Sequence, residues 1–219
     1  GVVSVPDERL DKLAELSRSK KKIPAVVEFY DIAGLVKGAS TGEGLGNQFL
    51  SHIREVQAIV HVVRCFGAGD IIHVENSVDP IRDIETINTE LILKDLETVE
   101  KRLHSAEKEF RAGSKEAGEV LEVLKIAKEK LLNGELLREF KDKPAIKELQ
   151  LLTAKEMLFL LNGNETDISS ELKHKIKELE CSHLHVDLSR ENSSPEQDRG
   201  IDFAPLIKKA YEILDLISF

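Results

Sequence analysis

Two heptad-spaced apolar stripes between residues 92 and 131 are the feature that most constrains how this chain folds. The first comprises Ile92, Leu96, Val99, Leu103, Ala106 and Phe110, and the second comprises Ala117, Val120, Leu124, Ala127 and Leu131. Apolar positions spaced alternately by three and four residues form a narrow seam along one side of an α-helix. The sequence RAGS at 111–114 separates the stripes, and Asn-Gly at 133–134 follows the second. The pattern therefore predicts an antiparallel helical hairpin.

The first arm of this hairpin is long. From residue 88 to residue 110 it would extend about 35 Å at 1.5 Å per residue. Asp79-Pro80 lies upstream and is typical of a helix start, with an N-cap followed by proline in the first turn. A seam of two apolar residues in seven favours a projecting coiled coil that contacts a partner, because a helix folded against a sheet usually carries a wider apolar stripe.

Four short apolar runs indicate buried strands, at residues 26–30, 59–63, 157–161 and 183–188. Each is rich in branched or aromatic residues, and helix-like sequence separates it from the next. Residues 1–5 are also strand-like. Strands that alternate with helices predict an α/β fold with a parallel sheet covered by helices.

Composition and charge narrow the functional classes. The chain has a net charge of −9, which argues against charge-driven nucleic-acid binding by the chain as a whole. It contains no apolar run long enough to span a bilayer, so no membrane association is expected. Its two cysteines, Cys65 and Cys181, have no metal-ligand spacing, and we interpret both as reduced, structural thiols.

The strongest local signal for chemistry is a strand that ends in Asp-x-x-Gly. The run at 26–30 leads directly to Asp31 and Gly34, and five of the 13 glycines lie between residues 34 and 46. At the carboxyl end of a strand, Asp31 could bind Mg²⁺ through water while the Gly34 N–H faces a terminal phosphate. The glycines would let the loop switch between two states. A flexible surface loop is the alternative.

Two further signals follow later strands. The strand at 157–161 is followed by Asn162, Gly163 and Glu165, an Asn-x-x-Glu pattern where GTPases have Asn-Lys-x-Asp. The longer glutamate should weaken selectivity for guanine, and a polar turn is the alternative interpretation. Ser189 follows the last strand, where nucleotide hydrolases of this type place backbone groups near the base. The order of the three signals along the chain matches that in a Ras-like domain.

Several longer segments resemble the signatures of one family. They are DIAGLVKGA at 31–39, GEGLGN at 42–47, HVVRCF at 61–66 and SVDPIRDIE at 77–85. They are similar to those of the Obg-like ATPase (YchF) family of P-loop NTPases. The resemblance is nearly unbroken from Val5 to Leu103 and looser beyond.

This resemblance implies a Ras-like P-loop NTPase sheet with an inserted antiparallel helical hairpin. The expected domains are residues 1–87, the half of the nucleotide-binding domain with the second switch, residues 88–140, the hairpin, and residues 141–219, the base-recognition half. The resemblance also implies ATP as the substrate in preference to GTP, which fits Glu165, together with Mg²⁺, a ribosome partner, a cytoplasmic location and a monomer. Leu35 occupies the position of the usual catalytic glutamine, and His73 is the candidate replacement, because a neutral imidazole can orient water.

A phosphate-binding loop, Gly-x-x-x-x-Gly-Lys-Ser/Thr, does not occur in the sequence. The resemblance implies that this loop and the first strand lie upstream of Gly1, and that a domain of the TGS type follows Phe219. We therefore expect the 219 residues alone to bind ATP weakly and to be inactive. We also expect the strands at 26–30 and 59–63 to have unpaired edges, because the missing strand lies between them in the Ras-like order.

Three functions remain open from the sequence. The leading hypothesis is an ATPase switch that acts on ribosomes. A non-catalytic hairpin module with a vestigial nucleotide site is the second, and an Obg-type GTPase, which would carry Asp at position 165, is the third.

Overall fold

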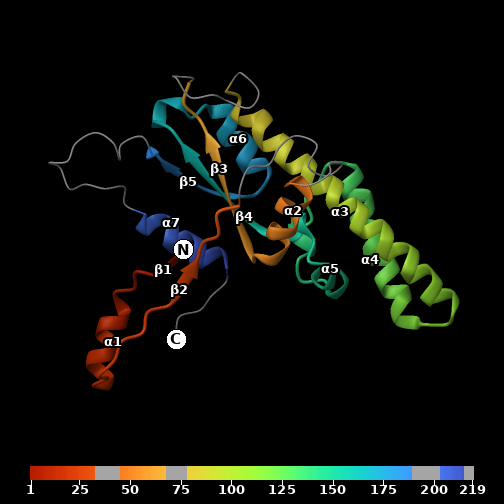
Figure 1. Cartoon of the computed structure of the whole chain (residues 1–219), viewed down its shortest axis with the longest axis horizontal. Helices are drawn as coiled ribbons and strands as arrows, with labels where there is room; N and C mark the ends of the chain where they lie inside the picture. The colour runs from red at the N-terminus through yellow and green to blue at the C-terminus, as the bar shows by residue number, and fades with distance from the viewer. Residues whose placement is uncertain (33–44, 68–77, 189–202, 215–219) are drawn as a thin grey trace. The chain divides into compact units, whose positions relative to one another are not determined.

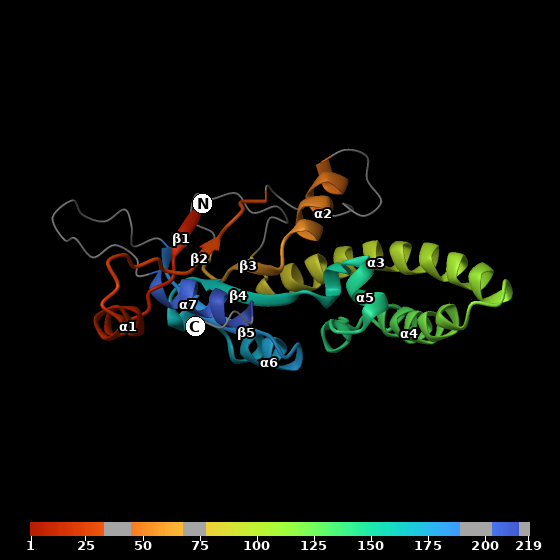
Figure 2. The same ribbon diagram turned by 90° about the horizontal axis from the view of Figure 1, so that it is seen from below.

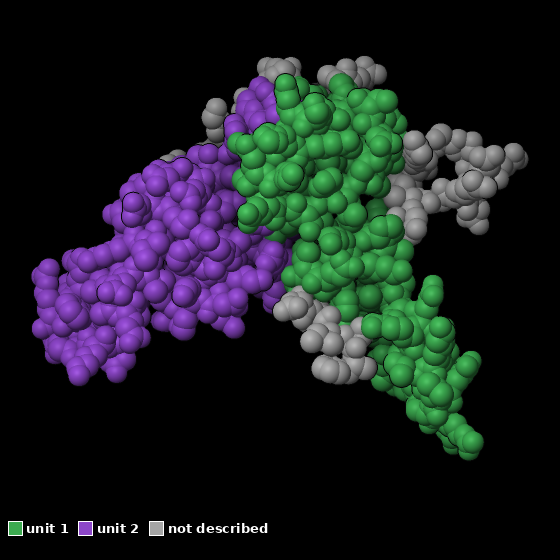
Figure 3. Space-filling view, turned by 180° about the vertical axis from the view of Figure 1, so that it is seen from behind, with its two compact units in different colours: residues 1–31, 60–78, 157–219 green, residues 32–59, 79–156 purple. Residues whose placement is uncertain are grey.

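The computed structural model describes residues 1–32, 45–67, 78–188 and 203–214 (Figure 1). The chain divides into two compact units, which Figure 3 shows in different colours. Unit 1 comprises residues 1–31, 60–78 and 157–219, and unit 2 comprises residues 32–59 and 79–156. Within the described ranges, none of the helices combines the length and the apolarity that a membrane-spanning segment needs.

Unit 1 holds nearly all of the strand residues. Its elements are β1 (Val2–Ser4), α1 (Arg9–Ser17), β2 (Val26–Glu28), most of β3 (Ala58–Arg64), most of β4 (Glu156–Asn162), a 3-10 turn (Glu165–Asp167), α6 (Ser170–Glu178), β5 (Ser182–Val186) and α7 (Ala204–Ile213). All five predicted strand positions are confirmed to within a few residues, and the α/β fold class is confirmed.

The described strands form two sheets rather than one. β1 pairs antiparallel with β2, with Val3 opposite Val27, and the second sheet has the order β3-β4-β5. β4 and β5 are parallel, as predicted. The strand at 26–30 lies outside this parallel pair, because β2 pairs antiparallel with β1. A parallel crossover needs a connection that packs over the sheet, whereas α1, which joins β1 to β2, has no buried residue.

Each of the two sheets has two edges without a strand partner among the described residues, and edges of β2 and β3 are among them. β3 lies at one edge of its sheet, and β2 is bonded to β1 along one side. On β3 the Val62 side chain is 53% exposed, although it lies in the middle of an apolar strand. These edges agree with the expectation for the strands at 26–30 and 59–63.

Burial along the strands follows their positions. Residues 157–161 of β4 are all buried, as expected for a central strand that is covered on both faces. In the smaller sheet, Val27 of β2 packs in a cluster with Val5 and with Ile207 and Ala210 of α7. This cluster explains the apolar side of α7, because that side covers the β1–β2 sheet.

The regular elements of unit 2 are helices and 3-10 turns, apart from the first residues of β3 and Glu156 of β4. Its elements are α2 (Leu45–Glu55), α3 (Pro80–Arg111), α4 (Lys115–Leu132), a 3-10 turn (Arg138–Phe140), α5 (Pro144–Leu149) and a second 3-10 turn (Leu152–Ala154). α3 and α4 run antiparallel and side by side, as Figures 1 and 2 show. The predicted helical hairpin is therefore confirmed.

The start of α3 and the end of α4 are capped as the sequence predicts, and the start of α4 has a further cap. The Asp79 carboxylate accepts a hydrogen bond from the Arg82 N–H at 3.0 Å, and Pro80 is the first helical residue. Between the arms, Gly113 has a φ of +99°, a backbone conformation that favours glycine. Ser114 then caps α4 by accepting from the Ala117 N–H at 3.2 Å. Gly134, with a φ of +80°, follows the end of α4.

The hairpin core contains most of the predicted seam. Ile92, Val99 and Ala106 of α3 are buried, as are Ala117, Leu124, Ala127 and Leu131 of α4. Two details differ from the prediction. Phe110 is 53% exposed, because α3 ends one residue later and the ring lies beside Gly118, where an added Cβ would be 3.1 Å from the ring. Leu121, which the stripe omitted, is buried.

A buried carboxylate joins the hairpin to the segment before β4. Asp95 of α3 is fully buried and accepts hydrogen bonds from the Leu152 N–H at 2.9 Å and the Thr153 N–H at 2.7 Å. It also accepts from the Thr153 hydroxyl at 2.7 Å. Burial raises the pKa of Asp95, and these three donors oppose that rise. The contact holds the turn at 152–154 against α3.

Candidate nucleotide-binding site

The candidate base site lies where β4 and β5 end. These strands are parallel and in register, with Asn162 opposite Val186, so their carboxyl ends meet at one edge of the sheet. Ligands of open α/β sheets bind at this edge. Asn162, Gly163 and Glu165, which the sequence analysis selected, all lie there in consecutive positions after β4.

Asn162 connects three strands at this edge. Its side-chain oxygen accepts a hydrogen bond from the Leu188 N–H at 3.0 Å, beyond the end of β5. Its main-chain carbonyl accepts from the Cys65 N–H at 2.8 Å, beyond the end of β3. A shorter or apolar residue could not make the first of these bonds. Asn162 therefore holds the connections after β3 and β5 to its own turn.

Gly163 occupies a position without room for a side chain. An added Cβ would lie 3.2 Å from the Cys65 Cβ, 3.3 Å from the Phe66 nitrogen and 3.3 Å from an Asp167 carboxylate oxygen. The Gly163 N–H donates to the Val186 carbonyl at 3.0 Å. The turn thus passes closely between the ends of β3 and β5, and this close approach is the physical reason for glycine here.

Glu165 is exposed and is the first residue of the 3-10 turn Glu165–Asp167. The turn is stabilised by a capping box in which the Asn164 N–H donates to the Asp167 carboxylate at 2.8 Å. Neighbouring side chains therefore satisfy the backbone of the turn. The Glu165 carboxylate remains in contact with solvent, at the edge where a base would bind.

The residues after β3 form a part of this edge that the sequence analysis did not assign to the site. Burial, with a smaller contribution from the Asp167 charge, raises the pKa of the Cys65 thiol to about 11. The thiol is therefore protonated at neutral pH, and neither Cys65 nor Cys181 forms a disulfide, in agreement with their interpretation as reduced. The Arg64 guanidinium lies 4.5 Å from the centre of the Phe66 ring. Only the HVVRCF segment itself could have pointed to these residues.

Asp31, the candidate magnesium ligand, follows β2 and is exposed. It lies after a strand of the other sheet from the one that carries Asn162. Gly34, Leu35, His73 and Ser189 lie outside the described residues. Of the described candidates, Asn162, Gly163 and Glu165 lie together in the turn after β4, where they are also neighbours in the sequence. Among the described residues, no three His, Cys, Asp or Glu side chains gather in a way that would hold a metal ion.

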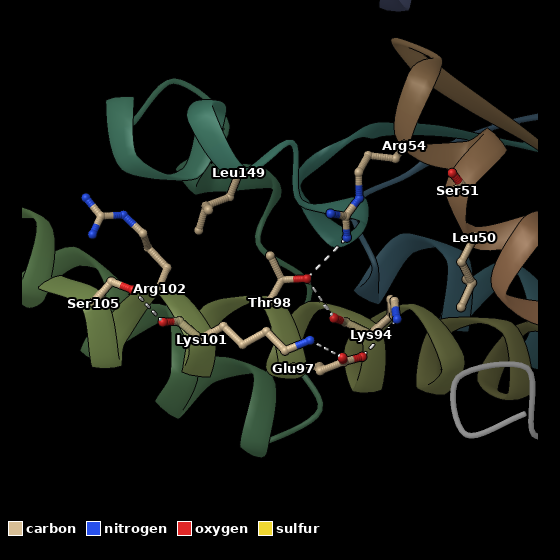
Figure 4. Close-up of a pocket in the computed structure, with 10 residues that line it drawn as sticks. All are labelled: Leu50, Ser51, Arg54, Lys94, Glu97, Thr98, Lys101, Arg102, Ser105 and Leu149. Atoms are coloured by element: carbon tan, nitrogen blue, oxygen red, sulfur yellow. Dashed lines mark hydrogen bonds and ion pairs between the residues drawn. The ribbon is translucent and has the colours of Figure 1, made fainter.

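Unit 2 contains a groove of about 640 Å³ between α2, α3 and the end of α5 (Figure 4). Its polar lining residues are Ser51, Arg54, Lys94, Glu97, Thr98, Lys101, Arg102 and Ser105. Arg54 of α2 donates to the Thr98 hydroxyl at 3.1 Å, which connects α2 to the hairpin. The sequence analysis did not find this groove, because its residues come from separate helices.

The charges of the groove are largely engaged with one another. Hydrogen bonds from Lys101 and Lys94 lower the pKa of Glu97 to about 2, and the Arg102 guanidinium lies 3.1 Å from the Glu109 carboxylate. Both pairs with Glu97 have helical spacing, at 2.5 Å for Lys101 and 2.8 Å for Lys94. We therefore interpret these contacts as stabilising α3 rather than as a ligand site.

Comparison of the chain with known proteins identifies related sequences. The model of the family described as "50S ribosome-binding GTPase" matches residues 12–103. The whole chain is 42% identical to a "Ribosome-binding ATPase YchF" of Bacillus subtilis, of which it covers 67%. It is 50% identical to the protein of that name from Escherichia coli O157:H7, of which it covers 66%. The chain thus spans about two thirds of the length of these relatives.

A solved structure gives the same result for the fold. The structure of the Schizosaccharomyces pombe YchF GTPase matches 97% of the chain and 65% of its own length, with a TM-score of 0.76 and 34% identity. The strand order, the base turn after β4 and the helical hairpin define a nucleotide-binding domain with the fold of P-loop GTPases. Within this class, the chain belongs to the YchF family.

Proposed function

We propose that this chain carries the second switch, the hairpin and the base-recognition site of a cytoplasmic ATP hydrolase whose partner is the ribosome. The observation that carries this proposal is the Asn162 contact. Its side chain orders the turn after β4 and binds the backbone beyond β5 at 3.0 Å, at the edge where nucleotides bind in this fold. The relatives named above are called ribosome-binding ATPases, which supports the same activity and partner.

Asp31 is the proposed magnesium ligand, through a water molecule. Its residue is exposed after β2, and its carboxylate oxygens are of the kind that Mg²⁺ prefers. One protein carboxylate fits this ion, because Mg²⁺ keeps several waters and takes its other ligands from substrate phosphates. When bound, the ion would neutralise charge on the phosphates. Gly34 would donate its N–H to the terminal phosphate.

The proposed hydrolytic residues come from the resemblance to the family. Leu35 cannot orient water, because it has no polar side-chain atom. His73 is proposed to orient the attacking water or accept its proton. Ser189 is proposed to offer backbone groups to the base, next to Leu188, whose own N–H is held by Asn162.

The experiment that tests the ATPase uses a full-length protein that contains this chain. Replacing Asp31 with Asn should lower magnesium-dependent ATP hydrolysis by about 10- to 100-fold, the range for residues that act on a metal through its outer shell. Glu28→Gln is a matched control, because Glu28 is an exposed carboxylate three residues earlier, on β2. A wild-type protein that hydrolyses no ATP would instead support the non-catalytic hairpin module.

Glu165 is the proposed determinant of the preference for ATP over GTP. It is exposed at the base-site turn, and its side chain is one methylene longer than the aspartate that pairs with guanine in GTPases. Glu165→Asp should shift the ratio of kcat/KM values toward GTP by about tenfold, equivalent to a gain of hydrogen bonds to guanine. A wild-type protein that already prefers GTP would favour the Obg-type GTPase.

The hairpin is the proposed surface for the ribosome. Its described residues include four exposed apolar side chains, with Leu93 43%, Phe110 53%, Ile126 47% and Leu132 65% exposed. We propose that the protein reaches its partner as a monomer. Cosedimentation of the full-length protein with ribosomes should fall when Phe110 and Ile126 are replaced by serine. The same replacement of Leu16, an exposed leucine of α1, should leave it unchanged.

A further inference from the structure

His185 of β5 makes a contact that joins it to the base-site turn. Its Nε2 atom lies 2.5 Å from the Gly163 carbonyl oxygen. A carbonyl oxygen can only accept a hydrogen bond, so Nε2 must carry the proton and donate. The neighbouring His183 lies on the same face of β5, since residues two apart in a strand point the same way. No hydrogen bond of His183 is seen within the described part of the chain.

The His185 contact completes a set of bonds that hold the Gly163 residue through both its N–H and its carbonyl. The Gly163 N–H donates to the Val186 carbonyl at 3.0 Å, while the Gly163 carbonyl accepts from His185. On the preceding residue, the Asn162 side chain accepts from the Leu188 N–H at 3.0 Å. Three consecutive contacts thus connect the turn to β5 and the residues just beyond it. Of these three contacts, only the one from His185 uses a side chain of β5.

The position of Gly163 makes the direction of its carbonyl important. The backbone is packed within 3.3 Å of where a Cβ would stand, against Cys65, Phe66 and Asp167, so the turn cannot shift toward β3. The peptide unit between Gly163 and Asn164 is held on its N–H side by the Asp167 carboxylate, which accepts from the Asn164 N–H at 2.8 Å, and on its carbonyl side by His185. The direction of this peptide determines the backbone path of the next residues, Asn164 and Glu165.

We propose that His185 is a positioning residue for nucleotide recognition, acting on the base through the Gly163 peptide. This inference rests on the proposed function, and it assigns a role to a side chain that does not itself contact the phosphates. Loss of the donor leaves the Gly163 carbonyl without its partner on β5, while Asn162 and Glu165 stay in place. Binding of the nucleotide is therefore weakened, while the chemistry at the phosphates is unaffected.

The test compares His185→Ala, His185→Gln and His183→Ala in a full-length protein that contains this chain. His185→Ala should raise KM for ATP about fivefold, the equivalent of one net hydrogen bond, with kcat changed less than twofold. His185→Gln should restore most of the affinity, because the glutamine amide can donate from a position close to that of Nε2. His183→Ala should behave as wild type.

The possible results separate this inference from the function on which it rests. If the wild type binds ATP and His185→Ala has the same KM as His183→Ala, the positioning role is wrong and the proposed function stands. If His185→Ala and His185→Gln both lower kcat and the unfolding midpoint together, the residue is structural and the inference is also overturned. If the wild-type protein binds no ATP, the proposed function and this inference fail together.

Discussion

The Asn162 side-chain oxygen accepts a hydrogen bond from the Leu188 N–H at 3.0 Å, across a sequence separation of 26 residues. This contact joins two segments that the sequence analysis assigned to the same base site on separate grounds. It makes a prediction about stability that does not depend on nucleotide.

Replacing Asn162 with Ala removes this acceptor and leaves the half-buried Leu188 N–H without its partner. The free energy of unfolding should fall by about 1 kcal/mol. Asn162→Asp keeps an oxygen that can accept the bond and should lose less. Urea unfolding of the three proteins measures the difference, and equal midpoints for Asn162→Ala and the wild type would show that the bond is unimportant.

Gly163→Ala should destabilise the fold by about 1–3 kcal/mol, because the added methyl group overpacks the space against Cys65 and Phe66. Gly67→Ala is the matched control: it lies beyond the end of β3, and an added Cβ there meets no atom within 4 Å. Thermal unfolding measures both. A Gly163→Ala protein as stable as Gly67→Ala would contradict the close approach.

The half-buried His61, whose Nδ1 atom is shielded from solvent, predicts a loss of stability in mild acid. Its Nδ1 atom is buried without a hydrogen-bond partner in the described structure, its ring centre is 5.4 Å from that of Phe159, and burial lowers its pKa to about 4. Between pH 6.5 and 4 the unfolded chain binds a proton that the folded chain does not. The contribution of His61 to the free energy of unfolding is therefore fully present above pH 6.5. It is lost as the pH falls to 4, by about 3 kcal/mol in total.

Unfolding in urea at pH 7 and pH 4.5 measures this effect. His61→Phe, which keeps an aromatic ring beside Phe159, should lose less stability between the two pH values than the wild type does. The exposed His183 provides the control, because His183→Asn should keep the wild-type dependence on pH. If His61→Phe and the wild type respond equally, other groups cause the acid sensitivity.

Asp95→Ala should be strongly destabilising, by about 2–4 kcal/mol, because it leaves three donors at Leu152 and Thr153 buried and unsatisfied. The control is Glu122→Ala, which removes an exposed carboxylate from α4. Urea unfolding followed by circular dichroism reports the loss. A change of less than 0.5 kcal/mol, the range of ordinary surface substitutions, would mean that the contact does not hold the turn at 152–154.

The sequence predicted the local features of this protein well. Strands, helix caps and the hairpin depend on the residues of one segment and its neighbours, so the cap at Asp79 and the turn that contains Gly113 could be predicted directly. The incorrect prediction that Phe110 belongs to the buried seam has a local cause as well. The heptad pattern continues through a residue whose helix is about to end, so periodicity alone places it in the seam.

The sequence by itself determined the fold class, the hairpin, the order of the switch and base motifs, and the family. It did so because periodicity, capping and short motifs are properties of neighbouring residues. Only the tertiary structure decided that β2 pairs antiparallel with β1, that Asp95 binds the turn before β4, and that His185 and Leu188 hold the turn at Asn162 and Gly163. These contacts join residues that are distant along the chain. Strand pairing and packing bring those residues together, and no local sequence pattern predicts such long-range contacts.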